Sequence, residues 1–248
     1  MYRAVARGDD DRAVIDGWHL LHEAVRSAMQ IEAVALVDDR HGAADRSLIE
    51  RLASQLDVAH VTRQVMAALS PVRTPSGVVA IVRKRTWSDQ ALLERQPALI
   101  VVAIDLQDPG NAGAIVRSAE AGGATGVLFT RGSADPWGWK TLRAAMGSTF
   151  RLPIMTATDS LDACDRVARA GARIIAATPR DGTPMYDLDL RAPVTIVIGG
   201  EGAGVTPDVL ARADARVTIP MAGGVESLNA AVAAALIVYE AARQRRNH

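Results

Sequence analysis

The chain has 248 residues, 49% of them hydrophobic, which is enough for one large domain or two modest ones. Its 28 basic and 28 acidic residues cancel, so the net charge excludes a global attraction to nucleic acid, and any basic surface must be local. A single cysteine, Cys164, excludes an internal disulfide, and no apolar run reaches the length of a membrane span. We therefore expect a soluble, cytoplasmic protein with no membrane partner.

Residues 1–82 alternate helical and strand patterns and predict a small α/β domain. Apolar residues recur at helical spacing from Val14 to Met29 and predict a helix over residues 13–30. Strands are expected at 31–37, 58–62 and 77–82, with helices at 46–56 and 63–70. The polar, charged stretch 83–97 predicts a linker.

Residues 98–248 continue the alternation and predict a second α/β domain. Strands are expected at 98–104, 126–130, 151–156, 173–178, 194–200 and 216–220, separated by helices, and a long last helix runs from about Glu226 to Arg243. Such alternation predicts a mainly parallel sheet that helices cover on both faces. Ligands of such folds bind at the carboxyl ends of the strands.

Three loops that follow strands carry the informative residues. They are DPGNAGAIVRSAEAGG (108–123), VIGGEGAGVTPDVL (197–210) and IPMAGGVESLNAAVAAALIVYE (219–240). Glycine allows a ligand to approach the backbone closely, and exposed backbone groups can bind an adenine edge and a ribose. Each loop alone also fits an ordinary α/β turn, in which Glu201 is a surface charge, Ser227 a helix N-cap and Asn229 a first-turn residue.

Taken together, the order and spacing of these residues resemble the SpoU-type (TrmH-like) RNA ribose 2'-O-methyltransferases of the SPOUT knotted superfamily. The matching residues are Asn111, Gly113, Arg117, Ala119 and Gly122; Gly199, Glu201, Gly202 and Gly204; and Ile219, Pro220, Met221, Ser227, Leu228 and Asn229. Residues 1–82, with TPSGVVAIV, resemble the RNA substrate-binding domain that often precedes this one. The chain departs from the family at Gly200, where Asn is frequent, and at Ala230 and Ala231, where Val-Ser is frequent.

The resemblance implies a trefoil knot, made by the second and third loops, that holds S-adenosylmethionine in a bent pose. Gly199, Ile219 and Leu228 would contact the cofactor mainly through backbone, and Thr178, Gly200 and Met221 would line its pocket. The first loop would face RNA. The resemblance also implies a homodimer whose last helix contributes to the interface and whose active site the partner completes. It implies no metal and no DNA partner.

Methyl transfer to a ribose hydroxyl needs an oriented nucleophile and stabilisation of the developing charge on oxygen. Arg117 matches the family's proposed catalytic residue, but a guanidinium is a very poor base. We therefore expect Arg117 to orient the ribose and a phosphate and to stabilise the incipient alkoxide. Asn111 would bind the ribose or hold Arg117, and Glu201 would position Arg117 or the substrate. Ser227 and Asn229 would brace the first loop and the hydroxyl.

Several alternatives remain at this point. A dinucleotide-binding dehydrogenase would need G-x-G-x-x-G, a spacing that PGNAGAI lacks. The substrate, expected to be 23S rRNA because a full N-terminal domain is present, could instead be tRNA, and the chain could be a catalytically silent RNA-binding relative. Two basic clusters, Arg83-Lys84-Arg85 and Arg243, Arg245 and Arg246, either bind the RNA backbone or are solvated charges.

Overall fold

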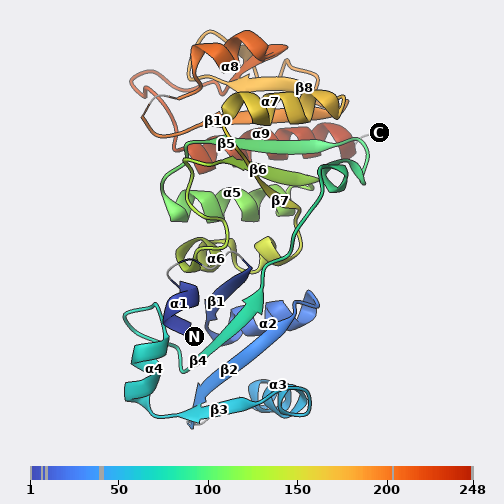
Figure 1. Cartoon of the computed structure of the whole chain (residues 1–248). Coiled ribbons are helices and arrows are strands. Elements are labelled where there is room, and N and C mark those ends of the chain that lie inside the picture. The colour runs from blue at the N-terminus through green and yellow to red at the C-terminus, as the bar shows by residue number, and fades with distance from the viewer. Residues whose placement is uncertain (1, 7, 9–10, 39–41, 203, 247–248) are drawn as a thin grey trace. The chain divides into compact units, whose positions relative to one another are not determined.

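The computed structural model describes residues 2–6, 8, 11–38, 42–202 and 204–246 (Figure 1). The chain forms two compact units, which are described separately. The first comprises Met1–Arg85 and Trp137–Arg151, and the second comprises Thr86–Pro136 and Leu152–His248. Residues 137–151, which the sequence analysis assigned to the domain at 98–248, thus group with the N-terminal residues.

The first unit is built on a four-stranded sheet with the order β1-β4-β2-β3. β4 pairs antiparallel with β1 and β2, and β2 pairs parallel with β3. The strands are β1 (Arg12–Asp16), β2 (Ile31–Val37), β3 (Val58–Val61) and β4 (Val78–Arg83). Its described helices are α1 (Tyr2–Ala6), α2 (Trp18–Arg26), α3 (Ala43–Ala53), α4 (Arg63–Leu69), α6 (Trp139–Ala145) and the 3₁₀ helix η2 (Ser148–Phe150).

One expectation for this unit is wrong. The helix predicted over residues 13–30 is interrupted, because Arg12–Asp16 forms β1 and only Trp18–Arg26 is helical. Ala13, Val14 and Ile15 are all buried, so both faces of this strand are apolar. Periodicity alone does not distinguish such a short apolar run from a helical segment. Gly17, with a φ of 111°, turns the chain between the strand and α2.

The segment Trp137–Arg151 contributes to the core of the first unit. Trp137, Leu142 and Phe150 belong to the same buried cluster as the apolar face of α2. Glu23 of α2 is buried and accepts hydrogen bonds from Arg151 and, at 2.9 Å, from Arg26. Burial raises the pKa of Glu23, but the two arginines outweigh it and hold the pKa below its ordinary value.

The second unit is built on a seven-stranded sheet with the order β7-β6-β5-β10-β8-β11-β9. Every pairing between its neighbouring strands is parallel, which confirms the expected α/β class. The strands are β5 (Leu99–Ile104), β6 (Gly126–Thr130), β7 (Ile154–Ala157), β8 (Arg173–Ala177), β9 (Thr183–Pro184), β10 (Val194–Gly199) and β11 (Ala215–Thr218). The two-residue strand β9 lies in a stretch that has no strand pattern.

Helices cover both faces of this sheet (Figure 1). α7 (Ser160–Arg169) and α8 (Pro207–Arg212) pack on one face, and α5 (Pro109–Ala121) and α9 (Ala230–Arg246) pack together on the other. The stretch 83–97 is more than a polar linker, since its 3₁₀ helix η1 (Asp89–Leu93) inserts Leu92 into the core under α7. No helix among the described residues is long and apolar enough to cross a membrane.

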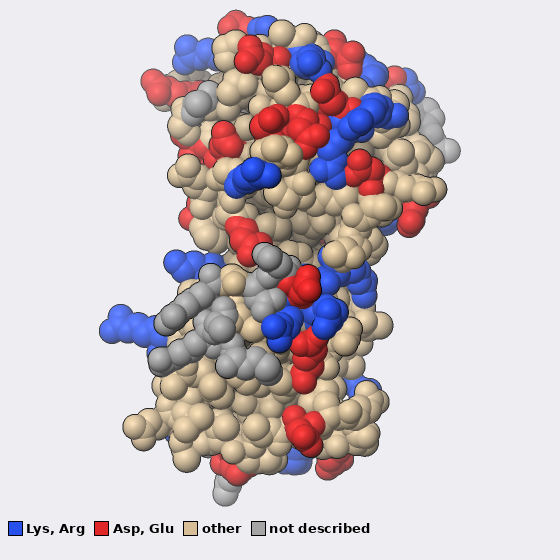
Figure 2. Space-filling view, in the orientation of Figure 1, with Lys and Arg blue, Asp and Glu red and all other residues tan. Residues whose placement is uncertain are grey.

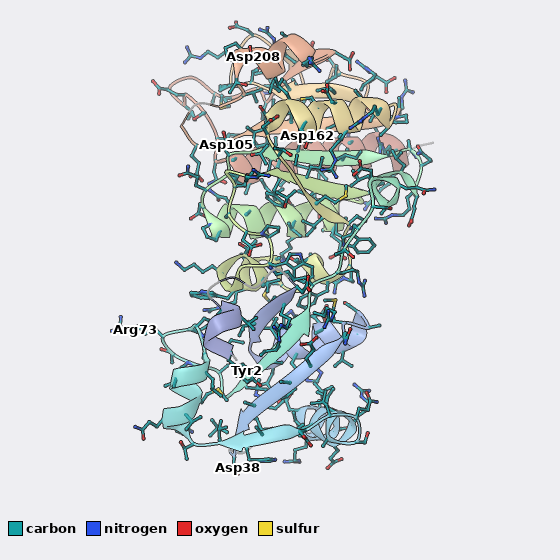
Figure 3. The ribbon with its side chains drawn as sticks, viewed as in Figure 1. Tyr2, Asp38, Arg73, Asp105, Asp162 and Asp208 are labelled. Carbon is teal, nitrogen blue, oxygen red and sulfur yellow. The ribbon has the colours of Figure 1, made fainter. Side chains whose placement is uncertain are left out.

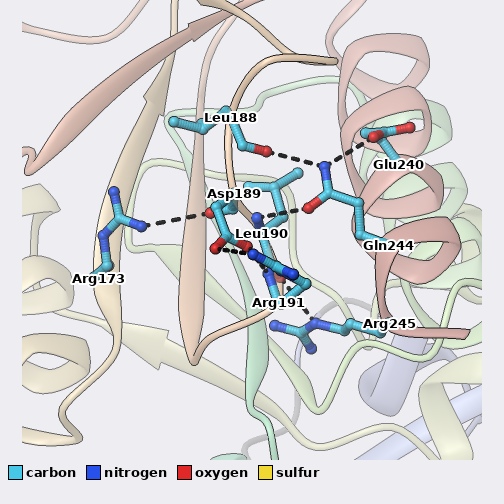
Figure 4. A network of polar contacts seen from close by, with 8 residues as sticks. All are labelled: Arg173, Leu188, Asp189, Leu190, Arg191, Glu240, Gln244 and Arg245. Atoms are coloured by element: carbon cyan, nitrogen blue, oxygen red, sulfur yellow. Dashed lines mark hydrogen bonds and ion pairs between the residues drawn. The ribbon is translucent and has the colours of Figure 1, made fainter. Parts of the chain in front are cut away.

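The carboxyl end of α9 is hydrogen-bonded to the residues that precede β5 and β10, and Figure 4 shows part of this network. Arg245 donates hydrogen bonds to the carbonyls of Pro97 (2.8 Å) and Leu190 (3.0 Å), and also to those of Ala98 and Ala192. Burial lowers the pKa of this guanidinium. The amide of Gln244 accepts from the N–H of Leu190 and donates to the carbonyl of Leu188 and to the carboxylate of Glu240. Arg245 therefore holds α9 against the amino ends of β5 and β10.

Candidate active site

The loops that follow β8, β10 and β11 surround a pocket of about 620 Å³, within the usual range for small-molecule sites. The register of the parallel strands brings these loops to the same, carboxyl edge of the sheet. Nine of the predicted cofactor-binding and catalytic residues line the pocket: Thr178, Gly199, Gly200, Glu201, Ile219, Met221, Ser227, Leu228 and Asn229. The six predicted cofactor residues and three of the five catalytic candidates are thus brought together.

The pocket also has an apolar wall that the motifs did not reveal. It is formed by residues of β10, the loop after it, α8, β11 and α9: Ile198, Val205, Leu210, Val217, Ala233 and Ile237. Helical and strand periodicity place most of these residues in the core, but periodicity does not tell which core residues face a cavity. The combination of apolar wall and exposed backbone loops suits a ligand with a flat apolar ring and polar edges.

The loop after β10 requires glycine at two adjacent positions. A Cβ atom on Gly199 would lie 2.1 Å from the backbone carbon of Gly204, and one on Gly200 would lie 2.4 Å from the carbonyl oxygen of Asp105. Gly204, with a φ of 64°, donates its N–H to the carbonyl of Gly200 and closes the loop. Asp105 itself has a φ of 48° at the end of β5, where Figure 3 labels it. This close packing presents the loop backbone to the pocket.

Three polar side chains from the three motif loops form a continuous chain of hydrogen bonds. Nδ2 of Asn229 donates to Oδ1 of Asn111 at 3.0 Å, and Nδ2 of Asn111 donates to the carboxylate of Glu201. Asn111 is held in place because Asp108, the N-cap of α5, accepts from its backbone N–H at 2.7 Å. The polar chain therefore joins the starts of α5 and α9 to the loop after β10.

Asn229 has a second role that differs from its expected one. Its Oδ1 accepts from the backbone N–H groups of Ala231 and Val232, so Asn229 rather than Ser227 caps α9. The helix consequently begins at Ala230 instead of near Glu226. Residues 221–229 form an irregular loop that is mostly exposed and contributes Met221, Ser227 and Leu228 to the pocket.

Arg117 stands apart from this chain. It is exposed on α5, about 9 Å along the helix from Asn111, and it does not line the pocket. It makes no hydrogen bond or ion pair with any residue that the structure describes. Glu201 bonds Asn111 and not Arg117, so the guanidinium is free to bind an external anion.

The two basic clusters are largely engaged within the chain. Arg83 pairs with Glu32 at 2.8 Å, and Arg85 donates to the carbonyls of Phe150 and Ser27. Arg243 pairs with Glu240 at 2.7 Å, and Arg245 is held as described above. RNA contacts by these clusters, Lys84 and Arg246 included, stay a prediction. Acidic and basic side chains intermingle on the face shown in Figure 2.

Among the described residues, no group of three or more His, Cys, Asp or Glu side chains is placed to hold a metal ion. The polar groups that line the pocket include the hydroxyls of Thr178 and Ser227, the amide of Asn229, the carboxylate of Glu201 and backbone groups. Such groups orient and hydrogen-bond an organic ligand or an alcohol.

Comparisons with known proteins give the same picture. Residues 98–239 match the model of the SpoU rRNA Methylase family, and residues 3–80 match the MRM3-like substrate binding domain. The chain is 29% identical over 226 residues to the 23S rRNA (guanosine(2553)-2'-O)-methyltransferase RlmP of Bacillus subtilis, covering 91% of this chain and 86% of that protein.

Solved structures agree over nearly the whole chain. The AdoMet-bound rRNA methyltransferase from Sinorhizobium meliloti is similar, with a TM-score of 0.85, 27% identity and coverage of 98% of this chain and 92% of that one. The SpoU methyltransferase AviRb from Streptomyces viridochromogenes, in complex with AdoMet, has a TM-score of 0.83 at 27% identity and covers 99% and 96%.

Proposed function

The chain belongs to the SpoU rRNA Methylase family as an S-adenosylmethionine-dependent RNA ribose 2'-O-methyltransferase, and from this premise we propose that its substrate is 23S rRNA. The hydrogen-bonded chain Asn229–Asn111–Glu201, whose two end residues line the pocket, is the observation that supports methyl transfer to an alcohol most directly. It offers amide and carboxylate groups to orient the alcohol. The relative RlmP, named for a 2'-O-methylation of 23S rRNA, favours that RNA over tRNA.

The pocket residues fit the cofactor. The glycine loop at 199–204 presents backbone groups for the hydroxyls and the ring edge of an adenosine, and Ile198, Leu210 and Ile219 provide apolar contact for its flat ring. Thr178, Gly200, Met221 and Leu228 complete this lining. When bound, S-adenosylmethionine supplies an electrophilic methyl group.

Methyl transfer would join the ribose 2'-oxygen to the methyl carbon and break the carbon–sulfur bond, and the hydroxyl proton would leave to a phosphate or water. Asn111 and Ser227 orient the hydroxyl. Glu201 fixes Asn111 by accepting a hydrogen bond from its amide nitrogen. Arg117, which has no acidic partner among the described residues, binds the neighbouring phosphate and stabilises the developing negative charge on oxygen.

We further propose that the chain works as a homodimer through α9. Val232, Leu236 and Tyr239 are 47%, 38% and 50% exposed, and their spacing places them on one side of the helix. A row of large apolar side chains left in water along one side of a helix is typical of an interface. The partner would complete the active site, which accords with the position of Arg117 outside the pocket of its own chain.

Three other features belong to the same proposal. The second and third motif loops form a trefoil knot, as in the family that the chain resembles. Residues 1–82 bind the RNA substrate, residues 83–97 link the two domains, and residues 98–248 carry the methyltransferase site, although residues 137–151 pack with the first unit. We place the enzyme in the cytoplasm.

The test is methyl transfer to defined RNA. Purified protein, tritiated S-adenosylmethionine and unmodified transcripts of 23S rRNA and of a tRNA pool are combined, and nucleotide-resolution mapping locates any 2'-O-methyl group. We expect one methylated ribose in 23S rRNA. Methylation of tRNA alone would overturn the choice of substrate, and methylation of a base or of neither RNA would overturn the activity.

A further inference from the structure

The most exposed large apolar side chain described in the second unit is Tyr186, at 61% exposure. Its neighbours in the chain are anchored, since Met185 is 4% exposed and Leu190 is fully buried. Tyr186 makes no hydrogen bond and no aromatic ring contact with a described residue. The exposed ring therefore offers a face on which a planar ligand can stack.

The register of the sheet places Tyr186 at the edge of the site. β9 pairs with β11 so that Pro184 lies opposite Thr218, and the N–H of Met185 donates to the carbonyl of Thr218 at 2.9 Å. Ile219, the residue that follows β11, lines the pocket. Tyr186 therefore follows the edge strand β9 closely in the chain and lies beside the start of the third motif.

The segment 179–187, here named the rim loop, is hydrogen-bonded within itself and to β11. The N–H of Asp187 donates to the carbonyl of Pro184 at 2.9 Å, which makes Tyr186 the third residue of a closed turn. The N–H of Gly182 donates to Oγ1 of Thr218 at 3.0 Å, and a Cβ atom on Gly182 would approach that oxygen to 2.6 Å. The ring of Tyr186 is thus presented by a turn that is bonded to the strand leading into the active site.

A cation lies on the same loop. Arg180 is exposed and directly follows Pro179, which lines the pocket, and it forms no ion pair or hydrogen bond with a described residue. Some other arginines of this unit are paired, as Arg166 is with Asp89 and Arg212 with Asp165, whereas Arg180 and Arg117 are not paired with a described residue. Asp181 and Asp187 flank the turn, so positive charge does not dominate the loop. A ligand that binds there must be recognised by the ring of Tyr186 as well as by the charge of Arg180.

We propose that the rim loop is a nucleotide subsite for the RNA next to the methylated residue. Tyr186 stacks on an unpaired base, and Arg180 binds the phosphate on the pocket side of that base. Aromatic side chains bind single-stranded RNA in this way, because every base has a face on which a ring can stack. The inference rests on the proposed RNA methyltransferase function and adds the requirement that the nucleotide beside the target be unstacked.

The experiment measures the KM for RNA, kcat and the Kd for S-adenosylmethionine with the 23S rRNA transcript. We expect Tyr186→Leu, which keeps apolar bulk, to raise the KM for RNA about tenfold, as the loss of one stacked base does. Tyr186→Phe should retain the wild-type KM. The Kd for S-adenosylmethionine should not change in either variant, because Tyr186 does not line the pocket.

A second arm tests the cation. Arg180→Ala should raise the KM for RNA and flatten its dependence on salt by roughly one phosphate contact. Arg169→Ala is the matched control, since Arg169 is exposed at the end of α7, which leads to the opposite edge of the sheet. It removes the same charge and should leave both quantities unchanged.

The outcomes separate the subsite from the enzyme's function. If wild-type protein methylates the transcript and Tyr186→Leu has the same KM, the subsite is wrong and the function stands. If Tyr186→Leu weakens RNA and S-adenosylmethionine binding equally, Tyr186 supports the pocket and the subsite is likewise wrong. If wild-type protein methylates no RNA, the proposed function fails first.

Discussion

Nδ2 of Asn229 donates a hydrogen bond to Oδ1 of Asn111, 118 residues earlier in the chain, at 3.0 Å. The other atom of the same amide, Oδ1, accepts from the N–H of Ala231 at 2.9 Å and caps α9. One side chain thus sets where the last helix begins and holds the first motif against the third. The two roles use different atoms, so substitutions can separate them.

Asn229→Ser should keep the cap and lose the bond to Asn111, because a hydroxyl caps helices about as well as an amide but is shorter. We expect a melting temperature close to that of wild type and a single-turnover methylation rate at least tenfold lower. Asn229→Ala should lose both, with a destabilisation of about 1 kcal/mol. Calorimetry and rapid quench on the same preparations provide the measurements. Equal rates for Asn229→Ser and wild type would show that the bond to Asn111 has no part in catalysis.

Arg117→Ala should leave folding and S-adenosylmethionine affinity nearly intact, since Arg117 has no partner among the described residues and does not line the pocket. The methylation rate should fall about 10²–10³-fold, the usual cost of one lost oxyanion stabiliser. Arg117→Lys should restore little, because an ammonium lacks the planar fork that holds two oxygens. Single-turnover rates and cofactor titration decide. A joint fall in cofactor affinity and rate would make Arg117 a structural brace.

The pH dependence of stability should report the Glu240–Arg243 pair. The hydrogen bond from Arg243 holds the pKa of the buried Glu240 carboxyl below its ordinary value, despite the opposing effect of burial. A lowered pKa in the folded state stabilises the protein above the unfolded-state pKa, about 4.3, and this contribution disappears as the pH falls through the folded-state pKa. Glu240→Gln should therefore melt below wild type at pH 7, and the gap should narrow below about pH 4.3.

Glu94→Gln is the control for this titration, since Glu94 is exposed and has no partner among the described residues. It should follow the wild-type melting curve at every pH. A gap between Glu240→Gln and wild type that is as wide at low pH as at pH 7 would mean that packing, and not charge, accounts for the loss.

Leu236→Glu should dissociate the proposed homodimer. Leu236 is the central residue of the exposed row on α9, and a charge there cannot be buried without a partner. We expect light scattering to report a folded monomer with little methyltransferase activity, while Val65→Glu, an exposed apolar position in the first unit, stays dimeric and active. A wild-type protein that is monomeric at micromolar concentration and still methylates RNA would disprove the dimer.

Local sequence patterns predicted most elements of the second unit. The strand expected at 98–104 is Leu99–Ile104, and the glycine loops lie at the carboxyl ends of β5 and β10 as anticipated. Buried strands and their turns are encoded by neighbouring residues, because apolar runs and glycines act over a few positions. The same local rule failed for β1, whose three apolar residues fit a helix equally well, and for β9, which is too short to have a pattern.

The contacts within the site depended on the tertiary structure. Motif spacing showed that Asn111, Glu201 and Asn229 belong to one site, but not that Asn111 bonds both of the others while Arg117 bonds neither. Nor did it show that Arg245 is held by four carbonyl groups. The sequence by itself determined where the glycine loops lie along the chain and which polar residues they carry, since these follow from local pattern and motif. Which of them touch was decided by the packing of helices and strands about a hundred residues apart, because a hydrogen bond forms only when that packing brings donor and acceptor within about 3 Å.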